Sequence, residues 1–513
     1  MGSSMRKKQS LLIFITIIFA GGIGFFYIFS PLHNNSADKT LLSCKDCNLL
    51  MISLSDVSAK NMSLYGYERI TTPNLDKWAK DALVFDNAFT QTSWTLPVAT
   101  SLFTSLYPYS HKVMGRFSEN ILDENIQTLP EILRDQGYKT AAFTGGLDYE
   151  SNFGHMRGFE EFEATNRNGN INVPGIFFAG LNIALAKGLG WMKKNANSKF
   201  FLFLHGYDTH CPFDPPEKFR GVFSSQNGKT VQIDNAHCIR GFEESEDESY
   251  KAYYYKSGGI EITLTKDDIN YLEGLYDEEI LSVDDSLENF LGSIDDQILD
   301  KTIIVIFSDH GEMFARNGRF GRGGNIRGTL YEEVLNIPLI IKIPHQKGER
   351  INGLVQIIDI MPTVLGLLDI SLLSERQGKN LIPFIEDNVE KINEYVFTGT
   401  IFGLDKAQSP VRKVYGIEST SESLRNDEWK LIHEIKVFND GNSPQETYEL
   451  YNLKDDPGEA DNLIEENTVV AEELKRILVL WQNETRAYVS SNTSNPNVLP
   501  EEIIEAVKAG GYR

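Results

Sequence analysis

The sequence predicts an α/β fold in which a mostly parallel central sheet carries helices on both faces. Short apolar runs typical of buried strands alternate with longer helical patterns, and the 513 residues are 41% hydrophobic, enough for a large core. The pattern changes near residue 400, where short polar strands precede an amphipathic helix. We therefore also predict a small C-terminal α+β subdomain.

The N-terminal segment predicts a transmembrane helix. Residues 11–30 contain no charged residue, and at about 1.5 Å per residue they span the roughly 30 Å of a bilayer. Basic residues at positions 6–8 precede this segment and only Lys39 follows closely. The positive-inside rule then places the N-terminus in the cytoplasm and the main domain in the periplasm or outside the cell, as a single-pass membrane protein. A cleaved signal peptide is the alternative, but no small-residue cleavage site follows the run.

The remaining elements follow in order from the apolar patterns. Strands are predicted at 48–54, 139–146, 199–206, 302–311 and 337–344, and helices at 72–83, 129–137 and 277–294. In the subdomain, strands are predicted within 411–437 and a helix at 469–484. The predicted organisation is a cytoplasmic tail (1–10), a transmembrane anchor (11–30), a stalk (31–47), a main domain (48–400), a C-terminal subdomain (401–489) and a tail (490–513).

The composition excludes one class of partner. Asp and Glu number 72 against 49 Lys and Arg, which gives a formal net charge of −23. Recognition of phosphate backbones needs an excess of basic residues, so we expect no nucleic-acid partner. The net charge does not restrict binding of carbohydrates, lipid head groups or small anionic esters, because the charge inside a cleft outweighs the global sum. The oligomeric state is left open.

The four cysteines are compatible with an exported protein. Cys44 and Cys47 form a C-x-x-C pattern without a second copy, which favours a local disulfide or two free thiols over a redox or metal motif. We prefer Cys211–Cys238 as the second pair, although connectivity cannot be deduced from the sequence.

Polar residues follow two of the predicted strands where ligands bind in doubly wound sheets. Asp56 follows the first strand, and Asp309 and His310 follow the fourth. A lone Asp after a strand usually caps a helix, whereas adjacent Asp and His side chains also suit a metal ion. The segment after the third strand carries His205 and His210, which are either structural or catalytic.

Thr95 stands at the start of a predicted helix and allows two interpretations. As an N-cap, its side chain would accept a backbone N–H, with Pro97 in the first turn. As a functional group, its hydroxyl would lie in the positive field of the helix N-terminus, which favours a bound anion or an oxyanion.

Together these segments resemble the sulfatase family of the alkaline phosphatase superfamily, over roughly residues 48 to 480. The likeness is carried, in order, by NLLMISLSD (48–56), QTSWTLPVATSLFTSLYP (91–108), FLFLHGYDTHCPFDPP (201–216), IIVIFSDHGE (303–312), TLYEEVLNIPLIIKIP (329–344), IIDIMPTVLGLLDI (357–370) and ELYNLKDDPGEADNL (449–463). The resemblance implies an alkaline-phosphatase-like fold and a hydrolase or transferase acting on sulfate or phosphate esters.

Residue by residue, the resemblance implies Thr95 as the nucleophile and His210 as a contact to the anionic group or the leaving oxygen. It implies a divalent metal ion at Asp56, Asp309 and His310. Oxygen ligands favour Ca²⁺ or Mg²⁺, and the imidazole leaves Zn²⁺ or Mn²⁺ open. Further substrate contacts are expected from His205, Asn317 and Arg322.

The sequence departs from the family pattern at the nucleophile and around it. Hydrolytic sulfatases carry a Cys or Ser that is oxidised to formylglycine, an aldehyde that Thr95 cannot form. Ser55 stands where a metal-binding Asp is expected, and Ala99 replaces a supporting Arg. Segment 144–152 lacks the Lys and His of the hydrolytic members.

Two functions follow from this pattern. The first is an active enzyme in which metal-assisted attack by Thr95 forms a covalent ester, for which phosphoryl chemistry fits a threonine better than sulfuryl chemistry. Its substrate would be a sulfated or phosphorylated small molecule, glycan or lipid head group. The alternative is a catalytically degenerate family member that binds an anionic envelope glycan, lipid or protein partner.

Overall fold

The computed structural model describes residues 42–115, 121–146, 148–149, 151–164, 180–225, 239–244, 249–254, 260–321, 329–372, 374–386, 388–402, 417–438 and 442–488. The predicted anchor at 11–30 and the tail at 490–513 lie outside the described residues. In the described part of the chain, no helix has the length and apolar character needed to cross a bilayer.

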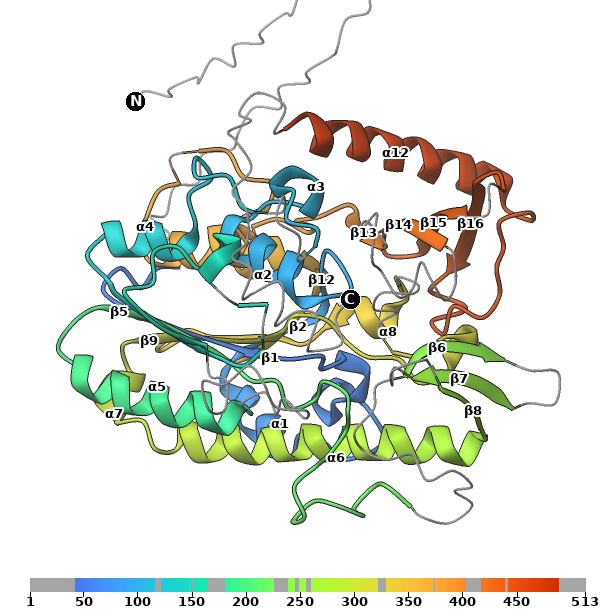
Figure 1. Ribbon diagram of the computed structural model, residues 1–513. Helices are drawn as coiled ribbons and strands as arrows, with labels where there is room; N and C mark the ends of the chain where they lie inside the picture. The colour runs from blue at the N-terminus through green and yellow to red at the C-terminus, as the bar shows by residue number, and fades with distance from the viewer. Residues whose placement is uncertain are drawn as a thin grey trace, which may run out of the picture. The chain divides into compact units, whose positions relative to one another are not determined.

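A nine-stranded mixed sheet forms the centre of the main domain, which confirms the predicted α/β class (Figure 1). In spatial order its strands are β10 (Asn336–Ile337), β2 (Leu83–Phe89), β11 (Leu339–Lys342), β9 (Thr302–Ser308), β1 (Asn48–Leu54), β5 (Phe200–His205), β3 (Lys139–Thr144) and β4 (Glu161–Ala164), with β12 (Glu349–Gln356) paired to β2. The run from β9 through β1, β5 and β3 to β4 is parallel throughout.

Helices cover both faces of this sheet, as the alternating pattern predicted. Leu49 and Met51 of β1 pack into one core, with α2 (Thr95–Thr104), α4 (Leu129–Asp135) and α9 (Ile360–Leu367). Leu50 and Ile52 point to the opposite core, with α5 (Leu181–Asn195) and α6 (Lys266–Leu291). Figure 1 shows α5 and α6 as the layer below the sheet and α2 and α4 above it. Because side chains alternate along a strand, an all-apolar strand such as β1 is buried on both faces.

The structure confirms the strand predicted at 337–344 and corrects two predicted helices. The strand predicted at 337–344 runs antiparallel to β9, because the chain leaves β9 and turns at the same edge of the sheet through α8 (Glu332–Leu335). The helix predicted at 72–83 is limited to the short helix α1 (Leu75–Trp78) and a 3₁₀ turn. The helix predicted at 277–294 begins earlier, at Lys266, where Thr265 forms a capping box.

The C-terminal part forms a four-stranded antiparallel sheet with one long helix. The elements are β13 (Val396–Phe402), β14 (Ile417–Arg425), β15 (Trp429–Phe438), β16 (Gln445–Asn452) and α12 (Thr468–Ala487). Leu424, Leu431 and Leu450 are fully buried on the sheet face that packs against Leu478 and Trp481 of α12. A separate three-stranded sheet contains β6 (Ile239–Glu244), β7 (Tyr250–Tyr254) and β8 (Ile260–Leu264).

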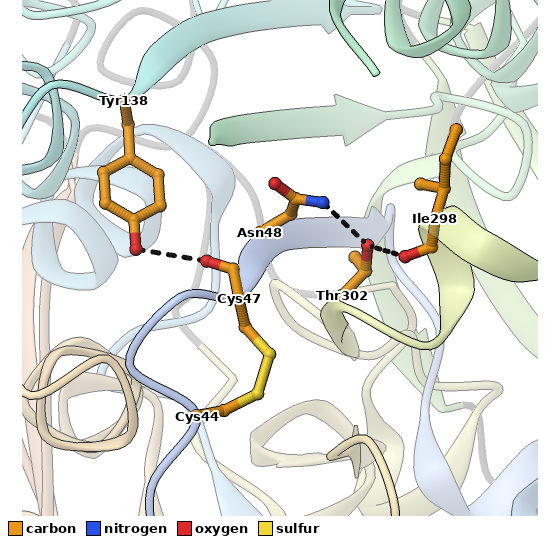
Figure 2. The surroundings of a disulfide bond; sticks show 6 residues. All are labelled: Cys44, Cys47, Asn48, Tyr138, Ile298 and Thr302. Atoms are coloured by element: carbon orange, nitrogen blue, oxygen red, sulfur yellow. Dashed lines mark hydrogen bonds between the residues drawn. A yellow bond between two sulfur atoms is a disulfide. The ribbon is translucent and has the colours of Figure 1, made fainter. Parts of the chain in front are cut away.

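The C-x-x-C pair forms a disulfide just before β1 (Figure 2). The Cα atoms of Cys44 and Cys47 lie 5.3 Å apart, and the Tyr138 hydroxyl donates to the Cys47 carbonyl at 3.1 Å. The Asn48 side chain then donates to the Thr302 hydroxyl of the neighbouring strand β9 at 3.3 Å. For Cys44 and Cys47 the sequence left open a local disulfide or two free thiols, and the structure contains the disulfide. Cys211 is also disulfide-bonded, and its predicted partner, Cys238, lies outside the described residues.

Candidate active site

The two predicted strand ends meet at one edge of the sheet. Strands β1 and β9 are parallel neighbours with Leu54 opposite Ser308, so the residues that follow them lie side by side. The Ser308 hydroxyl donates to the Leu54 carbonyl at 2.6 Å and accepts the Val57 amide hydrogen at 2.9 Å. The amide of Asp56, in turn, donates to Asp309 Oδ1 at 3.0 Å. These bonds fix the position of both aspartates.

Thr95 faces this edge rather than capping its helix. It is the first residue of α2, Trp94 occupies the cap position, and no side chain caps the helix. The Thr95 hydroxyl instead lies 3.4 Å from Nε2 of His310. The N-cap interpretation is therefore wrong. The Thr95 side chain is 2% exposed. The packing of α2 against the edge of the sheet holds it beside the predicted metal ligands Asp56, Asp309 and His310.

His310 is oriented by its second ring nitrogen. Nδ1 lies 3.0 Å from Oδ1 of Asp56 and 3.0 Å from the Gly311 carbonyl oxygen. Both neighbours accept hydrogen bonds, so Nδ1 carries the hydrogen, and a neutral ring presents Nε2 to Thr95 as an acceptor. Gly311 has no room for a side chain, because a Cβ would lie 2.1 Å from the Glu333 carbonyl oxygen of α8.

The donor set at this edge suits a divalent cation. Asp56, Asp309 and His310 are all fully buried, and Asp309 Oδ2 has no hydrogen-bond partner. Burial opposes ionisation of Asp309, but the imidazoles of His310 and His205 and the Asp56 amide hold its pKa below its ordinary value. A buried carboxylate oxygen without a donor is well matched by a metal ion. Within the described residues, however, no group of three or more His, Cys, Asp or Glu side chains is already arranged as a metal site.

His205 lies beside this cluster at the end of β5. Its Nδ1 is 3.0 Å from the Ser53 hydroxyl, and its Nε2 has no hydrogen-bond partner. Burial lowers the pKa of His205 to about 4, so the ring is neutral near pH 7.

Tyr149 is a site residue that the sequence did not reveal. Its ring centroid is 4.4 Å from that of His205, and its hydroxyl is buried without a hydrogen-bond partner. Burial, and the nearby charge of Asp309, raise the pKa of Tyr149 well above its ordinary value. The sequence feature that could have indicated Tyr149 is its position just beyond the strand predicted at 139–146, in the segment that lacks the family's Lys and His.

The other predicted residues belong to neighbouring loops. His210 stacks on Tyr207 with ring centroids 4.2 Å apart, and its Nδ1 is 2.5 Å from the Cys211 carbonyl oxygen. The Thr209 hydroxyl donates to the Ser55 carbonyl, which ties this loop to the end of β1. Asn317 lies in a 3₁₀ turn (Arg316–Gly318), but its side chain and the whole of Arg322 lie outside the described residues.

The chain belongs to the sulfatase family. The sulfatase family model matches residues 47–370, and a model of the C-terminal part of N-sulphoglucosamine sulphohydrolase matches residues 326–484. The predicted resemblance is confirmed, and with it the enzyme class, a sulfuric ester hydrolase. Sulfatases of this family generally use a divalent metal ion.

Individual relatives match over most of their length. Arylsulfatase K of Gallus gallus is 23% identical over 88% of this chain and 84% of its own. N-acetylglucosamine-6-O-sulfatase of Bacteroides thetaiotaomicron is 23% identical, covering 86% of each chain. The crystal structure of phosphonate monoester hydrolase of Agrobacterium radiobacter superposes with a TM-score of 0.65 at 19% identity, covering 86% of this chain and 96% of that one. This last likeness supports the fold alone.

Proposed function

We propose that this protein hydrolyses a sulfate ester carried by a sugar, with Thr95 as the nucleophile. The observation that carries the proposal is the chain of contacts from Asp56 through His310 to the Thr95 hydroxyl, with distances of 3.0 and 3.4 Å. This is the arrangement in which a base, itself oriented by a carboxylate, activates a hydroxyl group. The sugar is suggested by the likeness to N-acetylglucosamine-6-O-sulfatase.

In the proposed reaction, His310 Nε2 accepts the proton of Thr95 as its oxygen attacks the sulfur atom. The bond between sulfur and the sugar oxygen breaks, and His210 protonates that oxygen. Water then attacks the same sulfur and gives one proton to His210, the bond to the Thr95 oxygen breaks, and that oxygen recovers its proton from His310; hydrogen sulfate leaves. Both ring nitrogens of His310 are engaged, by Asp56 and the Gly311 carbonyl and by Thr95, so we assign it as the base rather than as a third metal ligand. A divalent cation held by Asp56 and Asp309 would supply positive charge against the charge that develops on the sulfuryl oxygens.

The test compares Thr95→Ala and Thr95→Ser on N-acetylglucosamine 6-sulfate, 4-nitrophenyl sulfate and 4-nitrophenyl phosphate. Thr95→Ala should lower kcat by more than about 10³-fold, because the nucleophile is lost, whereas Thr95→Ser keeps the hydroxyl and should retain activity. Thr100→Ala is the matched control, since this buried threonine belongs to the same helix and its hydroxyl donates to the Leu96 carbonyl at 2.9 Å.

Intact-mass measurement during turnover should detect one sulfuryl group on the wild-type chain and none on Thr95→Ala. A phosphoryl adduct and turnover of the phosphate ester alone would move the substrate class to phosphate esters. Turnover unaffected by Thr95→Ala would refute the nucleophile. If none of the three esters is turned over, the alternative is favoured, in which the protein only binds an anionic partner. The observation behind this alternative is Ser55, which stands where a metal-binding Asp is expected.

A further inference from the structure

One buried tyrosine joins the segments that form the candidate active site. Tyr276 lies in the middle of α6 and is fully buried. Its hydroxyl donates a hydrogen bond to the Asp56 carbonyl oxygen at 2.6 Å and accepts one from the Ser58 amide at 2.9 Å. Both bonds reach the backbone of residues 55–58, which we call the Asp56 turn. Tyr276 therefore fixes this turn, although it lies 220 positions further along the chain than Asp56.

The Asp56 turn needs this support because of its backbone conformation. Asp56 has a φ angle of +54°, in the left-handed region, which is uncommon for a residue other than glycine. Such a conformation persists only where the surrounding structure determines it. The Asp56 amide is held by Asp309 Oδ1 at 3.0 Å, and the Asp56 carbonyl is held by Tyr276. The backbone of Asp56 is thus fixed on both sides, once from the end of β9 and once from α6.

Two other segments of the site hold the ring of Tyr276. The Tyr276 ring centroid lies 5.6 Å from that of Phe213, in the segment that follows His210. It also lies 5.2 Å from the ring centroid of Phe314, in the segment that follows His310. Aromatic pairs at these distances attract one another, so the ring has support that does not depend on its hydroxyl. Replacing Tyr276 by phenylalanine should therefore remove the two hydrogen bonds and keep the packing.

The Asp56 turn determines how the Asp56 carboxylate meets His310. Oδ1 of Asp56 lies 3.0 Å from Nδ1 of His310, and Nε2 of the same ring lies 3.4 Å from the Thr95 hydroxyl. Because the side chain of Asp56 is short, a shift of its backbone also shifts its carboxylate. The imidazole is rigid, so a change at Nδ1 reaches Nε2. A displacement of about 1 Å in such a group can lower a rate about 10²-fold, even when its cause lies away from the reacting atoms.

We propose that Tyr276 is a positioning residue, whose hydroxyl holds the Asp56 turn so that the Asp56 carboxylate stays against His310. Tyr276 acts through Asp56 and does not contact the ester. Burial raises the pKa of Tyr276 well above its ordinary value, so its hydroxyl stays protonated and able to donate near pH 7. The effect on turnover rests on the proposed function, in which His310 is the base. The effect on the His310 ring does not.

Tyr138 offers a matched control at the other end of β1. It is also buried, and its hydroxyl donates to the Cys47 carbonyl at 3.1 Å (Figure 2). Cys47 precedes β1, whereas Asp56 follows it. The strand has seven residues, and at about 3.3 Å per residue it is about 23 Å long. Tyr138→Phe thus removes a buried hydroxyl that bonds to the backbone, far from the site.

The test compares Tyr276→Phe with Tyr138→Phe in the full-length protein. In Tyr276→Phe, the imidazole N–H signal of His310 in proton NMR spectra should shift, because the Asp56 carboxylate is no longer held against Nδ1. This signal is assigned by its loss in His310→Gln. Turnover of 4-nitrophenyl sulfate should show a kcat lowered about 10–100-fold with KM little changed, since the base acts in the transition state. Tyr138→Phe should change neither the signal nor kcat.

A merely structural role of the Tyr276 hydroxyl predicts a different result. Both tyrosine variants would then have a lower Tm, and the folded protein would keep the wild-type His310 signal and kcat. That result, or equal changes in both variants, would overturn the inference, as would a wild type without a His310 signal. If the wild type turns over none of the esters, the proposed function fails, and a His310 signal that shifts in Tyr276→Phe alone leaves the positioning role standing.

Discussion

Two buried clusters of charged residues differ in how completely their charges are paired. The site cluster comprises Asp56, Asp309 and His310. The junction cluster comprises Glu332, Arg425, Lys430 and Glu459, where the C-terminal sheet meets α8. The side chains of both clusters are 10% exposed or less. The first has two carboxylates for one imidazole, whereas the second has two carboxylates for two cations.

In the junction cluster every charge has an opposite charge within bonding distance. Lys430 Nζ lies 3.1 Å from Glu332 and 2.6 Å from Glu459, and Arg425 lies 2.7 Å from Glu332. Burial opposes ionisation of Glu332, but the two cations prevail and hold its pKa below its ordinary value. In the site cluster the nitrogen facing Asp309 Oδ2 is His310 Nε2, at 3.6 Å, which is beyond hydrogen-bonding distance. The difference indicates that the junction cluster holds the fold together, whereas the site cluster retains capacity for a ligand.

Lys430→Met should produce the largest loss of stability. Removing one partner from a buried ion pair leaves an uncompensated charge and costs about 3–5 kcal/mol. Urea denaturation should show this loss, while the turnover rate of the folded protein stays unchanged. Lys391→Met is the control. Both side chains of the Lys391–Asp427 ion pair are exposed, and such a pair contributes about 1 kcal/mol or less to the free energy of unfolding. Adding Glu459→Gln to Lys430→Met should restore part of the stability, because it removes a carboxylate that the first substitution leaves unpaired. Equal losses of stability in Lys430→Met and Lys391→Met would contradict the difference between the two clusters.

Asp309→Asn should abolish stabilisation by a divalent ion. At about 100 times its Kd, Ca²⁺ or Mg²⁺ stabilises a protein by about 2.7 kcal/mol, and we expect thermal unfolding of the wild type to show this shift. In a chelator at pH 7, Asp309→Asn should unfold below the wild-type temperature, because the pKa of Asp309 is held below its ordinary value and its ionised form therefore stabilises the folded state.

The matched control for Asp309 is Asp277, a carboxylate that is fully paired. Asp277 accepts hydrogen bonds from Asn61 at 3.1 Å, Tyr67 at 2.9 Å and Arg69 at 2.6 Å. Because both oxygens of Asp277 already accept hydrogen bonds, Asp277→Asn should keep the full shift on addition of the ion. A shift retained by Asp309→Asn would show that the cation binds elsewhere.

The strand ends could be predicted from the sequence because their signal is local. Apolar runs that stop at Asp56 and at Asp309 indicate the carboxyl ends of buried strands, and parallel neighbours bring such ends together. The direction of β11 could not be predicted in this way. It depends on the chain turning back at the same edge of the sheet, which the apolar run does not encode.

The parts of the site that were missed depend on long-range contacts. The segment Trp94–Thr95–Leu96–Pro97 is compatible with a cap at Thr95, and only the docking of α2 against His310 decides that Trp94 takes that position. Tyr149 reaches His205 across a turn that follows β3. Lys430 and Glu332 are 98 positions apart, so no local pattern reveals the junction cluster.

The smallest predicted effect on stability concerns His433, whose ring is paired with one buried and one half-exposed carboxylate. Its Nδ1 lies 3.2 Å from the buried carboxylate of Glu422, and its Nε2 lies 2.9 Å from the half-exposed Glu446. Its ring stacks on Tyr448, and Arg486 of α12 shares Glu422 at 3.2 Å. Burial opposes protonation, but the two carboxylates prevail and raise the pKa of His433 above its ordinary value.

Because the pKa of His433 is raised in the folded state, its contribution is complete below about pH 6.5 and is lost as the pH rises through the folded value. We expect the free energy of unfolding to fall as the pH rises above about 6.5, and His433→Gln to reduce this fall by about 1 kcal/mol or less. Exposed His345→Gln should leave it intact. Three other buried carboxyl groups have pKa values raised to about 6: Asp277, Asp284 and Asp359. They titrate alike in the wild type, His433→Gln and His345→Gln, so their contribution to the pH dependence is the same in all three. A slope that is equal in wild type and His433→Gln would mean that the imidazole stays neutral, and that this cluster is held by its hydrogen bonds rather than by charge.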